Sequence, residues 1–206
     1  MSLRPLTSFK AVEENVCISK SPLLFSLLKP KQDEQRLEIL DIGAARNNSI
    51  EYLSQIYCKV FISDCMSELC AMNNSLIEKP QKLNRALISA LHLYKNKPAD
   101  LDVILMWDII NYLDTSILSS MINYLLPHTN NTTQLHAYIH TSRLMPETHG
   151  KHEIISDQKI RSDNDSAITR DCPMYYQDAL NKHLHPFKVK RSILHANGMQ
   201  EYLFAK

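Results

Sequence analysis

The hydrophobic positions of this chain form two kinds of segment, which alternate along the sequence. Residues 37–42 (LEILDI), 59–63 (KVFIS) and 101–106 (LDVILM) are short strand-like runs, and the first and third are apolar enough to be typical of buried strands. Between the first two runs, Ile50, Leu53 and Ile56 recur at three-residue steps, which predicts a helix packed against a sheet. The order strand, helix, strand predicts a parallel sheet with right-handed crossovers.

Weaker patterns predict further helices and strands before, between and after these three runs. Residues 67–73 and 115–126 predict helices, the second with Asp114 or Thr115 as its N-cap, and residues 135–141 predict a further strand. Residues 83–88 (LNRALI) are interpreted as a strand, with a helix as the competing interpretation. Before the sheet, helical spacing within residues 11–29 predicts a helical lead-in that makes up residues 1–30, followed by a charged connection at 31–36.

The last third of the chain adds a polar segment and a hairpin. Residues 142–171 are polar and are expected to form an insertion, a lid or a mobile loop, and residues 175–184 predict a helix. The runs 187–194 and 199–205 flank Asn197-Gly198, a strong hairpin turn signal. We therefore predict one domain over residues 1–206. It is a Rossmann-like three-layer α/β sandwich, with a mostly parallel sheet of about seven strands and an antiparallel C-terminal hairpin strand.

Composition narrows the functional classes. The chain has 23 Lys and Arg residues against 22 Asp and Glu, a net charge of +1, so we predict no nucleic-acid partner. No leader-like segment or membrane span is visible, which favours a cytoplasmic protein without a membrane partner. Five cysteines without C-x-x-C spacing indicate reduced thiols, and the scattered histidines predict no metal site. Three glycines in all are too few for a Walker loop or a full dinucleotide fingerprint, and the chain has no G-x-S-x-G elbow.

Candidate chemistry lies at the carboxyl ends of the predicted strands, where ligands bind in open α/β sheets. The first strand ends in DIGAARN (residues 41–47) and the second in SDC (residues 63–65). Gly43 has no side chain, so the turn can approach a ligand closely. The Asp64 carboxylate can accept both hydroxyls of a ribose, and each charged hydrogen bond is worth roughly 1.5–3 kcal/mol.

These strand ends resemble the S-adenosylmethionine-dependent class I methyltransferases. In that family the first strand ends in a pattern like L-D-x-G-x-G-x-G, of which this chain keeps Leu40, Asp41 and Gly43. The family's second strand ends in an acid that holds the ribose hydroxyls, and Asp64 stands at that place.

The chain departs from the family's glycine pattern at two positions. Ala45 and Asn47 stand where the second and third glycines usually are. Positive φ at an alanine would cost about 1–2 kcal/mol, so Ala45 either keeps a negative φ in a reshaped turn or narrows the cofactor cleft with its methyl group. Asn47 is a milder change, because asparagine visits left-handed geometry or caps the following helix.

Two later stretches also resemble the family. Residues 99–113 (ADLDVILMWDIINYL) resemble its F-D-L-V-L-x-x-D-V-L-x-Y-L segment, and not the N-P-P-Y type motif, which argues against DNA methylation. Residues 88–93 (ISALHL) resemble its G-D-a-l-x-l-P segment, with Ser89 in place of the acid beside adenine.

The resemblance implies an S-adenosylmethionine-dependent methyltransferase that releases S-adenosylhomocysteine and acts on a small-molecule or protein acceptor. Catalysis in such a site is mainly positioning, and the candidate substrate-side residues are Asp108, Asn111 and Tyr112. The implied cofactor-binding residues are Asp41, Gly43, Ala45, Asp64, Cys65, Ser89, Ala90 and Trp107.

Each assignment has a structural alternative. Asp41 can organise the turn, Trp107 and Tyr112 can be core packing, and Cys65 can be a buried structural thiol. At the level of function, the alternatives are a methyltransferase-like scaffold that has lost or altered cofactor binding and serves as an interaction module, and a Rossmann-like domain for another nucleotide.

Overall fold

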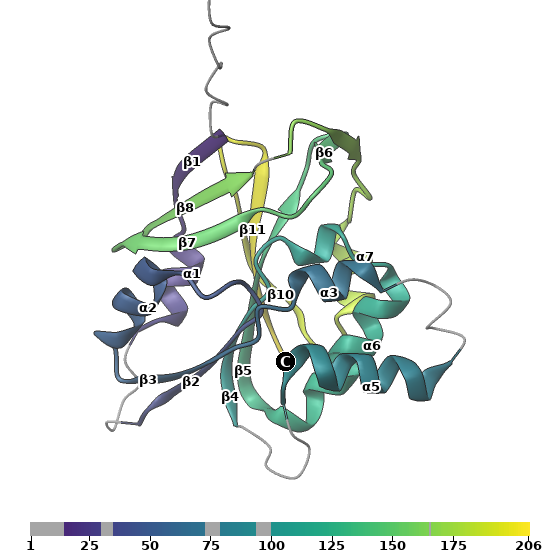
Figure 1. The fold of residues 1–206 in the computed structure, drawn as a ribbon. Coiled ribbons are helices and arrows are strands. Elements are labelled where there is room, and N and C mark those ends of the chain that lie inside the picture. The colour runs from purple at the N-terminus through teal and green to yellow at the C-terminus, as the bar shows by residue number, and fades with distance from the viewer. Residues whose placement is uncertain (1–14, 30–34, 73–78, 94–99, 165) are drawn as a thin grey trace, which may run out of the picture.

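The computed structural model describes residues 15–29, 35–72, 79–93, 100–164 and 166–206, and a six-stranded sheet lies at its centre (Figure 1). The strand order is β10-β11-β5-β4-β2-β3. Strands β2 (Leu37–Asp41), β3 (Cys58–Ile62), β4 (Leu101–Leu105) and β5 (Thr129–His140) are parallel. After β2 the chain moves to one side to form β3 and then returns to the other side to form β4, so the sheet has a switch point at β2.

Helices cover both faces of this sheet (Figure 1). Helices α1 (Pro22–Leu27) and α2 (Asn47–Ser54) lie on one side, and α5 (Pro80–Leu91), α6 (Thr115–Leu125) and α7 (Gln177–His183) lie on the other. Helix α3 (Met66–Ala71) packs near α5, and 3₁₀ turns span Ile109–Asn111 and Leu126–His128. All five residues of β4 are buried between the two helical layers, which explains why four of them are apolar. The fifth, Asp102, accepts a hydrogen bond from the Glu38 N–H at 2.8 Å.

The C-terminal strands form the predicted hairpin. Strands β10 (Lys188–Leu194) and β11 (Met199–Ala205) are antiparallel to each other, and β11 is antiparallel to β5. The turn between them closes with a hydrogen bond from His195 N to Met199 O, and Gly198 has a φ of 78°. The strand order and this hairpin confirm a Rossmann-like α/β fold with an antiparallel C-terminal strand.

The strand expected at residues 83–88 is wrong, because this segment belongs to helix α5. Its buried residues are Leu83, Leu87, Ala90 and Leu91, a spacing that lines one face of a helix. Pro80 stands in the first turn, where its fixed φ and missing N–H suit a helix start. The central sheet therefore has six strands among the described residues.

The helical lead-in is also wrong where it can be checked over residues 15–20. Asn15–Lys20 forms β1, which pairs antiparallel with β8 (Lys159–Asn164), and α1 starts only at Pro22. Val16 and Ile18 are β-branched and favour a strand once a partner strand is present. Residues 1–14 of the lead-in, residues 31–34 of the charged connection and residue 73 lie outside the described part of the chain.

The polar stretch 142–171 contains four strands. Strand β7 (Lys151–Ser156) pairs with β8, which completes the three-stranded sheet β1-β8-β7, and β6 (Leu144–Pro146) pairs with β9 (Thr169–Asp171). In Figure 1 the three-stranded sheet lies at the upper end of the central sheet, with β7 close to α2. None of the helices in the described ranges is long and apolar enough to cross a membrane.

Candidate active site

The register of the parallel strands brings the predicted site residues to one edge of the sheet. Asp41, the last residue of β2, pairs with Ile62 of β3 and with Leu105 of β4. The three strands therefore end level with one another. Two positions farther along the chain, Gly43, Asp64 and Trp107 follow these ends.

The carboxylate of Asp41 is held inside the protein. Its Oδ1 accepts hydrogen bonds from Trp107 Nε1 at 2.6 Å and from the Gly43 N–H at 2.8 Å, and the residue is only 4% exposed. Burial raises the pKa of Asp41 to about 6, although these two hydrogen bonds oppose the rise. Asp41 therefore organises the turn and fixes the Trp107 indole.

The indole of Trp107 lies directly on Gly43. A Cβ atom at Gly43 would be 2.6 Å from Trp107 Nε1 and 2.7 Å from its Cδ1. Gly43 is not among the positive-φ residues, so glycine is needed here for space and not for backbone freedom. Trp107 itself has a φ of 48°, which is rare for a bulky residue, and its carbonyl accepts a 2.7 Å hydrogen bond from Tyr138 N.

The turn after Gly43 settles the question raised by the missing glycines. Ala45 is exposed and is not left-handed, so the turn is reshaped and avoids the cost of a positive φ. Asn47 is the first residue of α2 and neither caps the helix nor adopts left-handed geometry. The N-cap is Arg46, whose side chain makes no capping hydrogen bond.

Strand β7 caps α2 in place of a local side chain. Glu153 Oε1 accepts a hydrogen bond from the Asn48 N–H at 3.2 Å, and the Ile154 N–H donates to Ser49 Oγ at 2.9 Å. Glu153 is 6% exposed, and its other oxygen lies 3.2 Å from the Arg161 guanidinium. A buried carboxylate thus lies at the positive end of the helix dipole.

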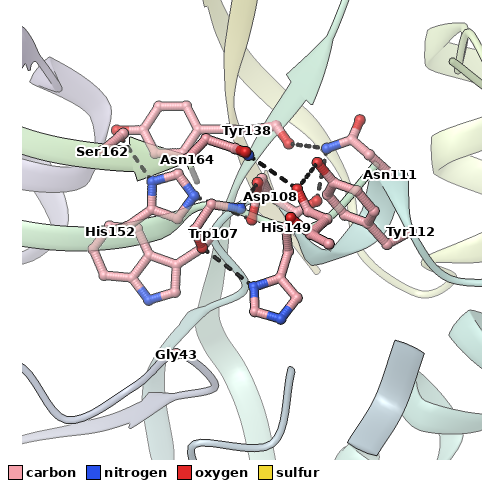
Figure 2. Close-up of polar contacts among 12 residues, drawn as sticks. Gly43, Trp107, Asp108, Asn111, Tyr112, Tyr138, His149, His152, Ser162 and Asn164 are labelled. Atoms are coloured by element: carbon pink, nitrogen blue, oxygen red, sulfur yellow. Dashed lines mark hydrogen bonds and ion pairs between the residues drawn. The ribbon is translucent and has the colours of Figure 1, made fainter. Parts of the chain in front are cut away.

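The neighbouring residue of β7 fixes the indole from the other side, as Figure 2 shows. The His152 ring stacks on Trp107 with a centroid distance of 5.3 Å and an interplanar angle of 4°. His152 Nε2 lies 3.1 Å from Asp108 Oδ1, while Asp108 Oδ2 accepts the Gly150 N–H at 2.8 Å. Burial opposes the ionisation of Asp108, but these contacts hold its pKa below the ordinary value.

All three candidate substrate-side residues make internal contacts. Asp108 holds residues 150 and 152, as described above. The Asn111 amide donates to the carbonyls of Asp108 and Tyr138, and the Tyr112 hydroxyl donates to the Thr148 carbonyl at 2.9 Å. Asp108, Asn111 and Tyr112 are buried. In this conformation they position the chain around Trp107.

A cavity of about 550 Å³ lies between the end of β3 and helices α3 and α5. Asp64 is exposed at this cavity, and none of the hydrogen bonds or ion pairs among the described residues involves its carboxylate. Ser63 Oγ donates to the Leu91 carbonyl at 3.0 Å and so ties β3 to α5. The predicted cofactor residues among those lining the cavity are Asp64, Cys65, Ser89 and Ala90.

The structure separates the predicted cofactor residues into two groups. One group surrounds the cavity, and the other, consisting of Asp41, Gly43 and Trp107, packs into a closed cluster beside it. Cys65 is 1% exposed, and burial raises the pKa of its thiol to about 12, so this sulfur stays protonated near neutral pH. Ala45 neither lines the cavity nor contacts the closed cluster through these hydrogen bonds.

Sequence reasoning missed the contribution of β7. His149 and His152 flank the start of this strand, and they belong to the scattered histidines for which the sequence predicts no metal site. No spacing rule links Glu153 to α2, which lies more than a hundred residues earlier in the chain. Among the described residues, no three His, Cys, Asp or Glu side chains come together as metal ligands would.

Strand order and strand-end chemistry define a Rossmann-like α/β domain with a cavity at the carboxyl edge of its sheet. No protein-family model matches the chain, and neither does any curated protein.

Solved structures with similar architecture share little sequence with this chain. The PH0226 protein from Pyrococcus horikoshii is 11% identical, with 89% of this chain and 86% of that one covered and a TM-score of 0.48. Magnesium protoporphyrin IX methyltransferase from Synechocystis, solved with bound S-adenosylmethionine, is 13% identical over 90% and 77% of the two chains, with a TM-score of 0.48. An S-adenosylmethionine-dependent methyltransferase from Clostridium acetobutylicum is 12% identical over 82% and 83%, with a TM-score of 0.45. The fold assignment rests on the strand order itself.

Proposed function

We propose that this chain is an S-adenosylmethionine-dependent methyltransferase for a small-molecule or protein acceptor, and that the nucleoside part of the cofactor binds in the Asp64 cavity. The observation that carries the proposal is the gathering of Asp64, Cys65, Ser89 and Ala90 around one cavity. Its volume of about 550 Å³ lies within the roughly 300–1,000 Å³ range of small-molecule sites.

The residues of the cavity suit a nucleoside. The exposed Asp64 carboxylate is available to accept the two ribose hydroxyls. Ser89 supplies an exposed hydroxyl on α5, and Ala90 supplies an apolar wall for the base. When bound, the cofactor supplies an electrophilic methyl group, so the chain's own task is to orient the acceptor and exclude water.

The proposal is tested by isothermal titration with S-adenosylhomocysteine, the stable product. Asp64→Asn keeps the size of the side chain and removes its charge, and it should weaken binding at least tenfold. Glu51→Gln removes one charge from the exposed surface of α2, away from the cavity, and should leave the affinity within twofold. No binding at millimolar ligand, or equal affinities for the two variants, would contradict the proposal.

A second function is favoured by the closed cluster next to the cavity. The methyltransferase resemblance implies that Gly43 and its neighbours hold the amino acid part of the cofactor. In this chain Trp107 fills the space above Gly43, and Glu153 occupies the start of α2, the helix that follows the glycine turn. A methyltransferase-like scaffold that serves as an interaction module fits this arrangement. It predicts that no adenosyl compound binds, even to variants in which the cluster is opened.

A further inference from the structure

The turn between β2 and α2 has the features of an anion site. A glycine is followed by a helix whose first N–H groups have no partner within the helix, and such helix starts bind carboxylates and phosphates. In this chain the group bound there is a side chain of the protein. The Glu153 carboxylate accepts the Asn48 N–H at 3.2 Å and is almost completely buried.

The same strand also fills the space above the glycine. His152 stacks on Trp107, and the Trp107 indole would touch any Cβ at Gly43. Asp108 fixes both His152 and the Gly150 N–H, which holds the start of β7 in place. Two consecutive residues, His152 and Glu153, thus close the glycine turn, one through an aromatic stack and one through its charge (Figure 2 shows the stack).

The closed turn and the open cavity are adjacent parts of one sheet edge. Asp64 at the cavity follows β3, and Gly43 follows β2, its parallel neighbour. Ser63 N donates to the Asp41 carbonyl at 2.9 Å, and Cys65 N donates to the Ile42 carbonyl at 3.3 Å. A ligand with its ribose at Asp64 would therefore place any 5′ extension toward Gly43, Trp107 and Glu153.

We propose that Glu153, with Trp107, determines the specificity of this site by standing where a carboxylate-bearing tail of a nucleoside ligand would bind. This inference rests on the proposed nucleoside site at Asp64. A second carboxylate beside buried Glu153 would meet a like charge in a poorly solvated place. The resting protein therefore prefers nucleosides without an amino acid tail, and a tailed cofactor enters only when β7 leaves α2.

The contribution of the amino acid tail can be measured with two ligands that share the same nucleoside. Both 5′-methylthioadenosine and S-adenosylhomocysteine are uncharged thioethers at sulfur with the same nucleoside, and only the second carries the amino acid group. Titrated separately into the wild-type chain, 5′-methylthioadenosine should bind at least tenfold more tightly. Glu153→Gln should reduce the affinity ratio, the affinity for 5′-methylthioadenosine divided by that for S-adenosylhomocysteine, at least fivefold. The reduction should come from tighter S-adenosylhomocysteine binding, while the affinity for 5′-methylthioadenosine should stay within twofold of the wild-type value.

Arg161→Gln is the matched control. Arg161 pairs with the outer oxygen of Glu153, while the inner oxygen holds the Asn48 N–H. Removal of the guanidinium leaves the negative charge at the helix start, so the ratio should not fall. A ratio that falls equally in Glu153→Gln and Arg161→Gln would overturn the proposed role of the Glu153 charge.

Trp107 is the only tryptophan of the chain and gives a second readout that needs no variant. Its emission should stay at the same wavelength when 5′-methylthioadenosine binds and move to longer wavelength when S-adenosylhomocysteine displaces the stack. Wild-type protein that binds S-adenosylhomocysteine as tightly as 5′-methylthioadenosine, without a change in emission, overturns this inference and leaves the nucleoside site standing. Absence of binding for both ligands instead overturns the nucleoside site, and the inference with it.

Discussion

The indole N–H of Trp107 donates a 2.6 Å hydrogen bond to Oδ1 of Asp41, across the ends of two adjacent parallel strands. This bond links the two segments that most resemble methyltransferase sequence, and it does so inside the protein. The Asp41 carboxylate and the Gly43 turn are therefore occupied by the chain itself, whereas the Asp64 cavity next to them is open.

The pKa of Asp41 predicts a specific pH dependence of stability. Burial raises this pKa from 3.8 to about 6, so the folded state binds the proton more tightly than the unfolded state. The associated stability is complete below pH 3.8 and is lost as the pH rises through about 6, for a total of about 3 kcal/mol. The Asp41→Asn variant has no carboxyl group at this position, so it should not lose this stability as the pH rises. Urea unfolding of both proteins from pH 4 to 7 should show the wild type losing stability relative to the variant, and a constant difference would contradict the prediction.

Gly43→Ala should destabilise the fold by about 1–3 kcal/mol, because the new Cβ would lie 2.6 Å from a fully buried, hydrogen-bonded indole. Ala45→Gly, in the same turn, changes an exposed residue and should cost less than about 1 kcal/mol. Chemical unfolding followed by Trp107 fluorescence measures both. Similar losses in the two variants would show that Trp107 does not press on Gly43.

Asp108→Ala should cost about 3–5 kcal/mol of unfolding free energy, because it leaves His152 and the Gly150 N–H buried without their partner. The same change should shift Trp107 emission, since His152 loses the contact that holds its stack. Asp114→Ala removes the N-cap of α6, whose side chain accepts the Ser116 N–H, and should cost only about 1 kcal/mol. A loss at Asp108 no larger than the loss at Asp114 would contradict the structural role of Asp108.

A buried network around Glu201 of β11, which reaches His136 of the neighbouring strand β5, gives a further test. Glu201 Oε1 accepts hydrogen bonds from Ser21 Oγ at 2.6 Å and Leu24 N at 2.9 Å and lies 2.9 Å from His136 Nε2, while Oε2 lies 3.1 Å from His195 Nε2. Burial opposes ionisation, but these contacts hold the pKa of Glu201 below its ordinary value. The network ties α1 to β11 and β5.

Glu201→Ala should therefore destabilise the protein by about 3–5 kcal/mol, since several buried donors lose their acceptor together. Glu147→Ala changes an exposed carboxylate and should stay within about 0.5 kcal/mol of the wild type. Thermal unfolding of the two variants under the same conditions makes the comparison. Equal melting temperatures would contradict the structural role of Glu201.

Local sequence was a good guide to elements that are defined by consecutive residues. The strand-like runs at β2, β3 and β4 and the Asn197-Gly198 turn carry their own signals. Buried strands such as β2 and β4 need mostly apolar residues, and the tight turn needs a residue that adopts a positive φ. Where two structures suit the same residues, the sequence was ambiguous. Residues 83–88 formed a helix because Leu83, Leu87 and Leu91 pack on one face of α5.

The features of the candidate site also fall into those that local sequence determined and those that depend on distant contacts. The sequence alone determined that Gly43, Asp64 and Trp107 follow the ends of three parallel strands, because strand ends and turns are encoded by consecutive residues. Only the tertiary structure decided that Trp107 covers Gly43, that Glu153 occupies the start of α2, and that Asp64 faces an open cavity. These outcomes depend on contacts between segments far apart in the chain, and no local spacing encodes which side chain fills the space above a glycine.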